Sequence, residues 1–151
     1  MYLALAIDLA TVNITEGGGP FGAVIVKDGE IIARGQNRVT RDFDPSAHAE
    51  VVAIREAGRA IADFSLTGAT LYSSCEPCPM CMATALWARV DRIVYAADRH
   101  DAAAGGFDDL AFYELFSTPR GEWDVRVEQR DAATQFRPFA TWLASDERTD
   151  Y

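Results

Sequence analysis

The sequence predicts a domain of the α/β class, with helices on both faces of a mixed β-sheet. Short β-rich segments alternate with longer segments whose apolar residues recur at helical spacing. A hairpin pattern precedes this alternation, so the sheet should not be purely parallel. With 151 residues, of which 49% are apolar, the chain is long enough for one domain with a substantial core.

The elements predicted in residues 1–62 are a helix at 2–15, strands at 23–26 and 31–33, a loop at 37–46 and a helix at 48–62. The Gly-Gly-Gly-Pro run at 17–20 ends the first helix. Asp28-Gly29 lies between the two strands and is typical of a tight hairpin turn, because that turn needs positive φ. The second helix has a buried face made mostly of alanine.

The elements predicted in the rest of the chain are strands at 69–73, 92–97 and 125–128 and helices at 79–88, 107–116 and 136–144. Pro79 suits the first turn of its helix, where its missing N–H costs nothing. Strands thus alternate with helices as far as residue 116, which supports the α/β class.

The composition and the N-terminal sequence indicate which classes of partner and which cell compartment to expect. Acidic residues outnumber basic ones by 23 to 14, giving a net charge of −9, whereas nucleic-acid binders usually carry a basic footprint. The cluster of Arg34, Arg38 and Arg41 is interpreted as a solvated face. The N-terminus lacks the basic start of a signal peptide, and no apolar run reaches the roughly 18–20 residues that span a membrane. We therefore expect a cytoplasmic protein without nucleic-acid or membrane partners.

All three cysteines lie in residues 73–81, SSCEPCPMC. Disulfides are uncommon in a reducing cytosol, and the count is odd. A ferredoxin-type cluster needs a fourth cysteine, and a thioredoxin-like dithiol occurs in a different βαβ context. A catalytic zinc site needs only three protein ligands, so one further good ligand would favour zinc.

His48 can be that ligand. The segments His48-Ala49-Glu50 and Pro77-Cys78-Pro79-Met80-Cys81 match the zinc-deaminase signature H-x-E followed by P-C-x-x-C. Cys78 and Cys81 stand three residues apart at a helix start, which places both thiolates on one side and favours the charged form. We predict that His48, Cys78 and Cys81 bind one Zn²⁺ per subunit, with water as fourth ligand. Cys75 is interpreted as a thiol at a strand end.

Glu50 is the predicted catalytic residue. Two thiolates cancel the charge of Zn²⁺, so the metal lowers the pKa of its water less than an all-histidine site would. Glu50 follows His48 closely enough to take that water's proton without binding the metal, and to pass it to leaving ammonia. Without the three ligands, the same residue would be interpreted as an exposed helix position.

The chain resembles the cytidine deaminase superfamily, and within it the bacterial guanine deaminases. The similar stretches are GGGPFGAVIVKDGEIIARGQN, DPSAHAEVVAIREA, LYSSCEPCPMCMATALWAR, AAGGFDDLAFY and the terminal PFATW and DY. The resemblance implies a three-layer α/β/α sandwich with a five-stranded mixed sheet. It also implies a homodimer that exchanges a C-terminal segment of about residues 130–151, and the conversion of guanine to xanthine and ammonia.

The same resemblance implies a set of base contacts, which are Asn37, Ala49, Asp109 and Tyr151, with Phe21 and Trp87 packing on the ring. An amide can both donate to and accept from guanine, a carboxylate accepts from its ring N–H groups, and aromatic rings offer stacking faces. Other interpretations are open: Asn37 could end the hairpin, the two aromatic residues could be core, and Asp108 or Asp109 could cap the helix after Phe107.

Other functions compete with guanine deamination. Guanosine, ammeline or another s-triazine, cytosine, and adenosine in tRNA are alternative substrates, although the acidic composition disfavours tRNA. A non-catalytic binding protein with a structural zinc is a different class of function. Structural zinc sites usually have four protein ligands, and this sequence offers three.

Overall fold

The computed structural model describes residues 1–150, and Tyr151 lies outside the described residues. The chain divides into two compact units, Met1–Glu114 and Leu115–Tyr151. The elements are α1 (Tyr2–Thr15), β1 (Gly22–Lys27), β2 (Glu30–Gln36), α2 (Val39–Asp42), α3 (Ala49–Ile61), β3 (Ala69–Cys75), α4 (Pro79–Trp87), β4 (Arg92–Ala97), α5 (Arg99–Ala104), α6 (Asp109–Phe116), a 3-10 helix (Arg120–Glu122) and α7 (Arg137–Leu143).

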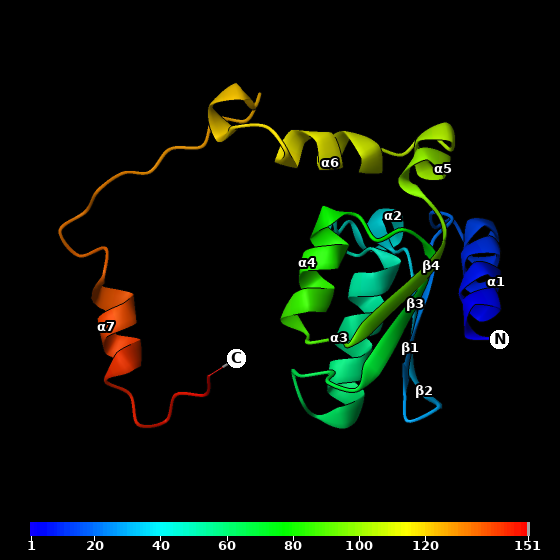
Figure 1. The fold of residues 1–151 in the computed structure, drawn as a ribbon, viewed down its shortest axis with the longest axis horizontal. Helices are drawn as coiled ribbons and strands as arrows, with labels where there is room; N and C mark the ends of the chain where they lie inside the picture. Colours follow the sequence, from blue (N-terminus) through cyan, green and yellow to red (C-terminus); the bar gives the residue numbers. More distant parts are fainter. Residues whose placement is uncertain (151) are drawn as a thin grey trace. The chain divides into compact units, whose positions relative to one another are not determined.

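The first unit holds a mixed sheet with the strand order β2-β1-β3-β4 (Figure 1). Strand β1 pairs antiparallel with both β2 and β3, and β3 pairs parallel with β4. Helix α1 packs on one face, while α3 and α4 lie on the other. The predicted α/β class and mixed sheet are therefore confirmed.

The expected five-stranded sheet is wrong, because the sheet has four strands. The missing strand is the one predicted at 125–128, where the structure has no regular element. Val125 and Val127 are both exposed. A strand needs a neighbour for its N–H and C=O groups, and within residues 1–150 this segment has none in the sheet.

The central strand β1 is buried on both faces, which explains its continuous apolar run. Val24 and Val26 pack with Ala6 of α1. Ala23 and Ile25 point the other way, into the larger core beneath α3 and α4. This alternation is the period of two that a strand requires, and it joins the two helical layers through a single strand.

Helix α3 lies unusually close to strand β2 at Gly35. A Cβ atom on Gly35 would stand 2.1 Å from the Ala49 carbonyl oxygen and 2.6 Å from the Ala53 nitrogen. The face that α3 turns to the sheet has only methyl side chains at Ala49, Ala53 and Ala57, all fully buried. Small residues on both sides let the helix backbone rest directly on the strand, and this sets where the first turn of α3 lies.

Two short helices were not predicted. Helix α2 lies within the predicted loop at 37–46. Helix α5 follows β4, and its start has a capping box, in which the Asp98 side chain accepts from the backbone of Asp101 while the Asp101 side chain accepts from the backbone of Asp98. Helix α6 begins at Asp109 rather than at Phe107.

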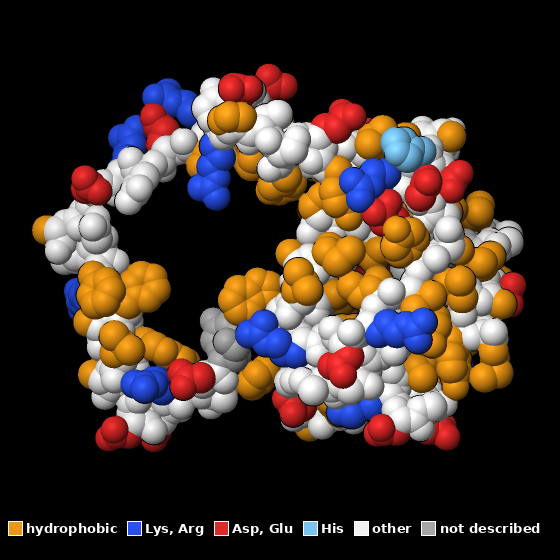
Figure 2. Space-filling model, in the orientation of Figure 1, with side chains coloured by type: hydrophobic (Ala, Val, Ile, Leu, Met, Phe, Trp, Pro, Cys, Tyr) orange, Lys and Arg blue, Asp and Glu red, His pale blue; other side chains and the backbone are white. Residues whose placement is uncertain are grey.

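The second unit has little regular structure. It contains the 3-10 helix and α7, which confirms the helix predicted at 136–144. None of residues 115–150 is buried. Figure 2 shows hydrophobic side chains on the surface of this second unit. The large exposed ones are Phe116, Val125, Val127, Phe136, Phe139, Trp142 and Leu143.

No helix within residues 1–150 is both long enough and apolar enough to cross a membrane.

Replacing Gly35 with alanine tests the contact between α3 and β2. We expect Gly35→Ala to lower the free energy of unfolding by about 2 kcal/mol or more, because its methyl group must push α3 off the strand. Thermal unfolding and zinc affinity measure this, and both should decrease. Gly121→Ala is the matched control, since a Cβ there meets nothing within 4 Å. Equal melting temperatures (Tm) for the two variants would contradict the role given to Gly35.

Candidate metal centre and base pocket

The three predicted metal ligands stand at two helix starts. His48 is the residue that precedes α3, Cys78 precedes α4, and Cys81 lies in the first turn of α4 after Pro79. The proline fixes a helical φ angle and lacks the N–H that a first-turn residue would leave unpaired. The Cys81 backbone N–H in the first turn of α4 donates to the Cys78 sulfur, which favours negative charge there.

The spacing of the ligand atoms fits a tetrahedral zinc ion. The Cys78 Sγ is 3.6 Å from the Cys81 Sγ and 3.7 Å from His48 Nδ1, and all three ligand atoms lie within 4.8 Å of one another. Zinc–sulfur bonds of about 2.3 Å and zinc–nitrogen bonds of about 2.0–2.1 Å, at tetrahedral angles, require about 3.8 Å between sulfurs and about 3.6 Å between sulfur and nitrogen. His48, Cys78 and Cys81 therefore form a zinc site.

Hydrogen bonds among the ligands favour a thiolate before any metal binds. Hydrogen bonds donated by the Cys81 thiol and by His48 Nδ1 lower the pKa of Cys78 to about 4. The same bond to Cys78 raises the pKa of Cys81, and the bond to Cys78 raises the pKa of His48. The three ligand atoms thus form one hydrogen-bonded group, in which Cys78 is the sulfur that favours the thiolate.

Glu50 lies in the first turn of α3 and is buried beside the sulfurs. Its Oε1 accepts a hydrogen bond of 3.1 Å from the Ser73 hydroxyl, and its Oε2 accepts one of 3.4 Å from the Cys81 thiol. Burial raises the pKa of this carboxyl. A zinc-bound thiolate has no proton to donate, so zinc binding leaves Oε2 free to handle a proton.

A cavity of about 200 Å³ opens in front of this group. The residues that line it are Gly19, Phe21, Asn37, Val39, Thr40, His48, Glu50, Glu76, Phe107 and Asp109. The structure therefore brings Phe21, Asn37 and Asp109 together with His48 and Glu50. Asp108 is exposed and is not part of this lining.

Asn37 and Asp109 are two further polar residues in the lining of the cavity. Asn37 is buried, and its Oδ1 accepts a 3.3 Å bond from the Val39 N–H, which is the turn role that the sequence left open. Its side chain lines the cavity as well. Burial raises the pKa of Asp109, because a half-buried carboxylate loses part of its hydration.

Of the two aromatic residues predicted to pack on a substrate ring, only Phe21 lines the cavity. Trp87 ends α4, nine residues after Cys78 and so about 13 Å along the helix axis, and 62% of it is exposed. Phe107, which the sequence did not single out, lines the cavity together with Phe21. Its ring meets Phe21 edge to face, with centroids 4.7 Å apart. Ala49 is fully buried in the core and does not line the cavity.

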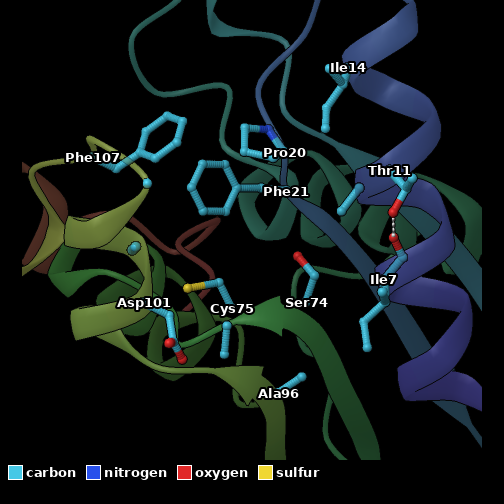
Figure 3. A pocket seen from close by; sticks show the side chains of 14 residues that line it. Ile7, Thr11, Ile14, Pro20, Phe21, Ser74, Cys75, Ala96, Asp101 and Phe107 are labelled. Carbon is cyan, nitrogen blue, oxygen red and sulfur yellow. Dashed lines mark hydrogen bonds between the residues drawn. The ribbon is translucent and has the colours of Figure 1, made fainter.

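A second, more apolar cavity of about 350 Å³ lies behind this aromatic pair (Figure 3). Phe21 and Phe107 line both cavities and so form the wall between them. Cys75 lines the second cavity, where its thiol donates to the Asp98 carbonyl at 3.6 Å. Burial raises the pKa of this thiol to about 12. Cys75 is thus a protonated strand-end thiol outside the ligand set, as predicted.

Glu76 anchors the loop that carries Pro77 and Cys78. Its carboxylate accepts from the Arg99 backbone N–H and guanidinium, which lowers the pKa of Glu76. The Arg99 guanidinium stacks on the Tyr113 ring at 3.4 Å, and the Tyr113 hydroxyl donates to the Pro77 carbonyl. This network ties α5 and α6 to the ligand loop.

Sequence reasoning missed Ser73, Phe107 and Thr40. A signal existed for Ser73, because a serine within a predicted buried strand needs a hydrogen-bond partner. Phe107 stands in the AGGFDD stretch beside Asp109, but nothing local indicates that it reaches Phe21. Thr40 lies on a helix of four residues that the sequence did not reveal.

Comparisons with known proteins agree with this site. The chain is 45% identical to the guanine deaminase of Bacillus subtilis (strain 168) over 151 residues, which cover 99% of this chain and 97% of that protein. The X-ray structure of the B. subtilis guanine deaminase superposes with a TM-score of 0.96, covering 99% of this chain and 96% of that one. A guanine deaminase structure from Nitrosomonas europaea gives 0.69 at 33% identity, covering 72% of this chain and 63% of that one.

A tRNA-specific adenosine deaminase of B. subtilis is 39% identical over 118 residues, which cover 78% of this chain and 73% of that protein. Residues 1–97, which include all three zinc ligands and Glu50, match the family model for the cytidine and deoxycytidylate deaminase zinc-binding region. The chain therefore belongs to the family of zinc-dependent deaminases that this region defines.

Proposed function

We propose that the protein hydrolyses free guanine to xanthine and ammonia. The observation that carries this is the position of Glu50, whose buried carboxylate contacts a zinc-ligand set at the wall of a cavity lined by Asn37 and Asp109. Full-length similarity to a guanine deaminase supports guanine as the base. A structural zinc would leave a buried carboxylate beside the ligands without a purpose.

His48, Cys78 and Cys81 hold the zinc ion, which when bound supplies a water molecule activated for attack at neutral pH. Glu50 then carries the protons. The water oxygen bonds to C2 of guanine, and one water proton passes through Glu50 to ring N3. The remaining hydroxyl proton passes through Glu50 to the departing amine as the C2–N bond breaks, so the products are xanthine and ammonia.

The raised pKa of Glu50 suits both transfers. A carboxylate whose pKa lies above the ordinary value accepts a proton more readily than an exposed glutamate, yet it still releases the proton to an amine. The Ser73 hydroxyl holds Oε1, which restricts the carboxylate to one orientation. Oε2 is then the oxygen that meets the water and the leaving group.

Base recognition is assigned to Asn37 and Asp109 in the lining of the cavity. The Asn37 amide can bond an edge of guanine that has both donors and acceptors, and the Asp109 carboxylate accepts from ring N–H groups. Phe21 and Phe107 provide aromatic surface, although their edge-to-face packing leaves open which ring contacts the base. Tyr151, outside the described residues, is proposed to close the site.

We also propose that the protein acts in the cytoplasm as a homodimer whose C-terminal segments, about residues 130–151, are exchanged. Residues 115–150 include no buried residue, and their large apolar side chains are exposed. Exposure of many large apolar side chains in one segment is unfavourable in water and favours association.

The first test is the reaction itself. We expect ammonia release from guanine, with xanthine formed in equal amount, and loss of at least 90% of the rate after chelation of the zinc, restored by added Zn²⁺. Guanosine, ammeline, cytosine and a tRNA anticodon stem are assayed in parallel. Turnover of one of these without turnover of guanine would keep the deaminase chemistry and reject the substrate.

The second test separates proton transfer from metal binding. We expect Glu50→Gln to keep one zinc per chain while kcat falls by about 10³-fold or more, because an amide cannot carry the proton. Glu56→Gln is the matched control, since Glu56 lies on the same helix in an exposed pair with Arg59, and its activity should be unchanged. Loss of zinc from Glu50→Gln would make Glu50 a ligand or a structural residue.

The third test concerns exchange of the C-terminus. Deletion of Tyr151 and Glu50→Gln should each inactivate the enzyme when alone. Co-refolding the two variants should restore up to about a quarter of wild-type activity, because half the dimers are mixed and each mixed dimer has one intact site. Sedimentation analysis checks that dimers form. Activity that stays at the level of the separate variants would count against exchange.

A further inference from the structure

Asn13 is the one polar side chain of α1 that is fully buried among residues 1–150. It lies in the last turn of the helix, on the side facing the sheet. A buried carboxamide is stable only when its N–H groups are hydrogen-bonded. Both are used: Nδ2 donates at 2.8 Å to the carbonyl of Gly19 and at 2.8 Å to the carbonyl of Asn37.

These two acceptors belong to separate segments of the base pocket. Gly19 lies in the loop after α1, and Asn37 follows strand β2; both line the cavity in front of Glu50. The Asn37 N–H in turn donates to the Phe21 carbonyl at 3.1 Å. Both backbone groups of Asn37 are therefore fixed, one of them by Asn13, before its side chain meets a substrate.

The sequence next to Asn13 is adapted to this contact. A Cβ atom on Gly18 would stand 2.3 Å from Asn13 Nδ2 and 2.6 Å from the Asn37 carbonyl oxygen. Only glycine lets the loop pass this close to the hydrogen bond between the carboxamide and the Asn37 carbonyl. The glycine run that ends α1 thus does more than stop a helix, because it makes room for the link from Asn13 to the pocket.

Stability alone does not explain an asparagine here. Its Oδ1 is buried and makes no hydrogen bond within the described residues. A buried acceptor without a partner lowers stability, so part of what the two Nδ2 hydrogen bonds contribute to stability is lost again. The feature that only the carboxamide provides is the pair of donors that holds Gly19 and Asn37 at one distance from each other.

We propose that Asn13 is a positioning residue for base recognition. It holds the pocket wall formed by Gly19 and Asn37, and it thereby sets where the Asn37 carboxamide meets the base. The inference rests on the proposed function, in which that carboxamide contacts guanine. Asn13 does not line the cavity itself, so its effect on the reaction passes through Asn37.

A double-mutant cycle tests this. The proteins are wild type, Asn13→Leu, Asn37→Ala and the double variant, each in the zinc-loaded form. We expect kcat/KM for guanine to fall about tenfold in Asn13→Leu and about a hundredfold in Asn37→Ala, mainly through KM. The double variant should be within about twofold of Asn37→Ala, because no carboxamide is left to position.

Zinc content and Tm separate positioning from folding. Zinc content should stay near the wild-type value in Asn13→Leu, while Tm should fall moderately, because the Gly19 and Asn37 carbonyls lose their donor and removal of the unpaired Oδ1 offsets only part of that loss. Thr15→Val is the control on the same helical turn: its hydroxyl bonds only the Val12 carbonyl, and its kinetics should not change. Effects that multiply to about a thousandfold in the double variant would overturn the proposal, as would full activity in folded Asn13→Leu.

If Asn13→Leu does not fold, Asn13→Ser replaces it in the same cycle with the same criteria. Failure of both variants to fold and bind zinc would make Asn13 a structural residue and overturn the proposal. The wild-type assay keeps the two proposals apart. If the wild type turns over another amino-heterocycle but not guanine, the substrate assignment fails and the cycle is run on that compound. If it turns over none, both proposals are wrong.

Discussion

The direct contact between helix α3 and strand β2 at Gly35 is the constraint on which the metal centre depends. His48 and Glu50 stand at the start of α3, while Cys78 and Cys81 stand at the start of α4. Strand β1 pairs with both β2 and β3, so the sheet sets the distance between these two helix starts. A zinc site tolerates errors of only a few tenths of an ångström, and packing of backbone on backbone provides that accuracy.

Burying Glu50 beside two cysteines would be unfavourable if packing were its only purpose. A buried carboxylate loses its hydration and repels nearby thiolates, which is why its pKa is raised. The Ser73 hydroxyl compensates in part, and the positive charge of zinc compensates for the thiolates. The protein therefore keeps a strained electrostatic arrangement at one point, where a proton must be both accepted and released.

The sequence predicted correctly those helices and turns whose formation depends only on residues within the same segment. Helical spacing and the turn at Asp28 located most of the first unit, and the capping box of Asp98 and Asp101 was a readable signal for α5 that went unused. The segment at 125–128 is different, because a strand forms only if some neighbour pairs with it, and a sequence does not say which chain supplies that neighbour. The position of Trp87 likewise depends on the direction of α4, which its distance from Cys78 along the sequence does not reveal.

The metal-binding part and the base-binding part of the pocket also differ in how far a local sequence pattern predicts them. Three ligands and Glu50 come from two short motifs, so the metal end can be recognised from spacing alone, and the tRNA-specific relative matches across that region too. The base end is assembled from Phe21, Asn37, Phe107 and Asp109, which no local pattern connects. A sequence motif can therefore identify the zinc chemistry without identifying the base. Asn13 illustrates the consequence, because a residue on α1 that never reaches the cavity can still decide how its wall is placed.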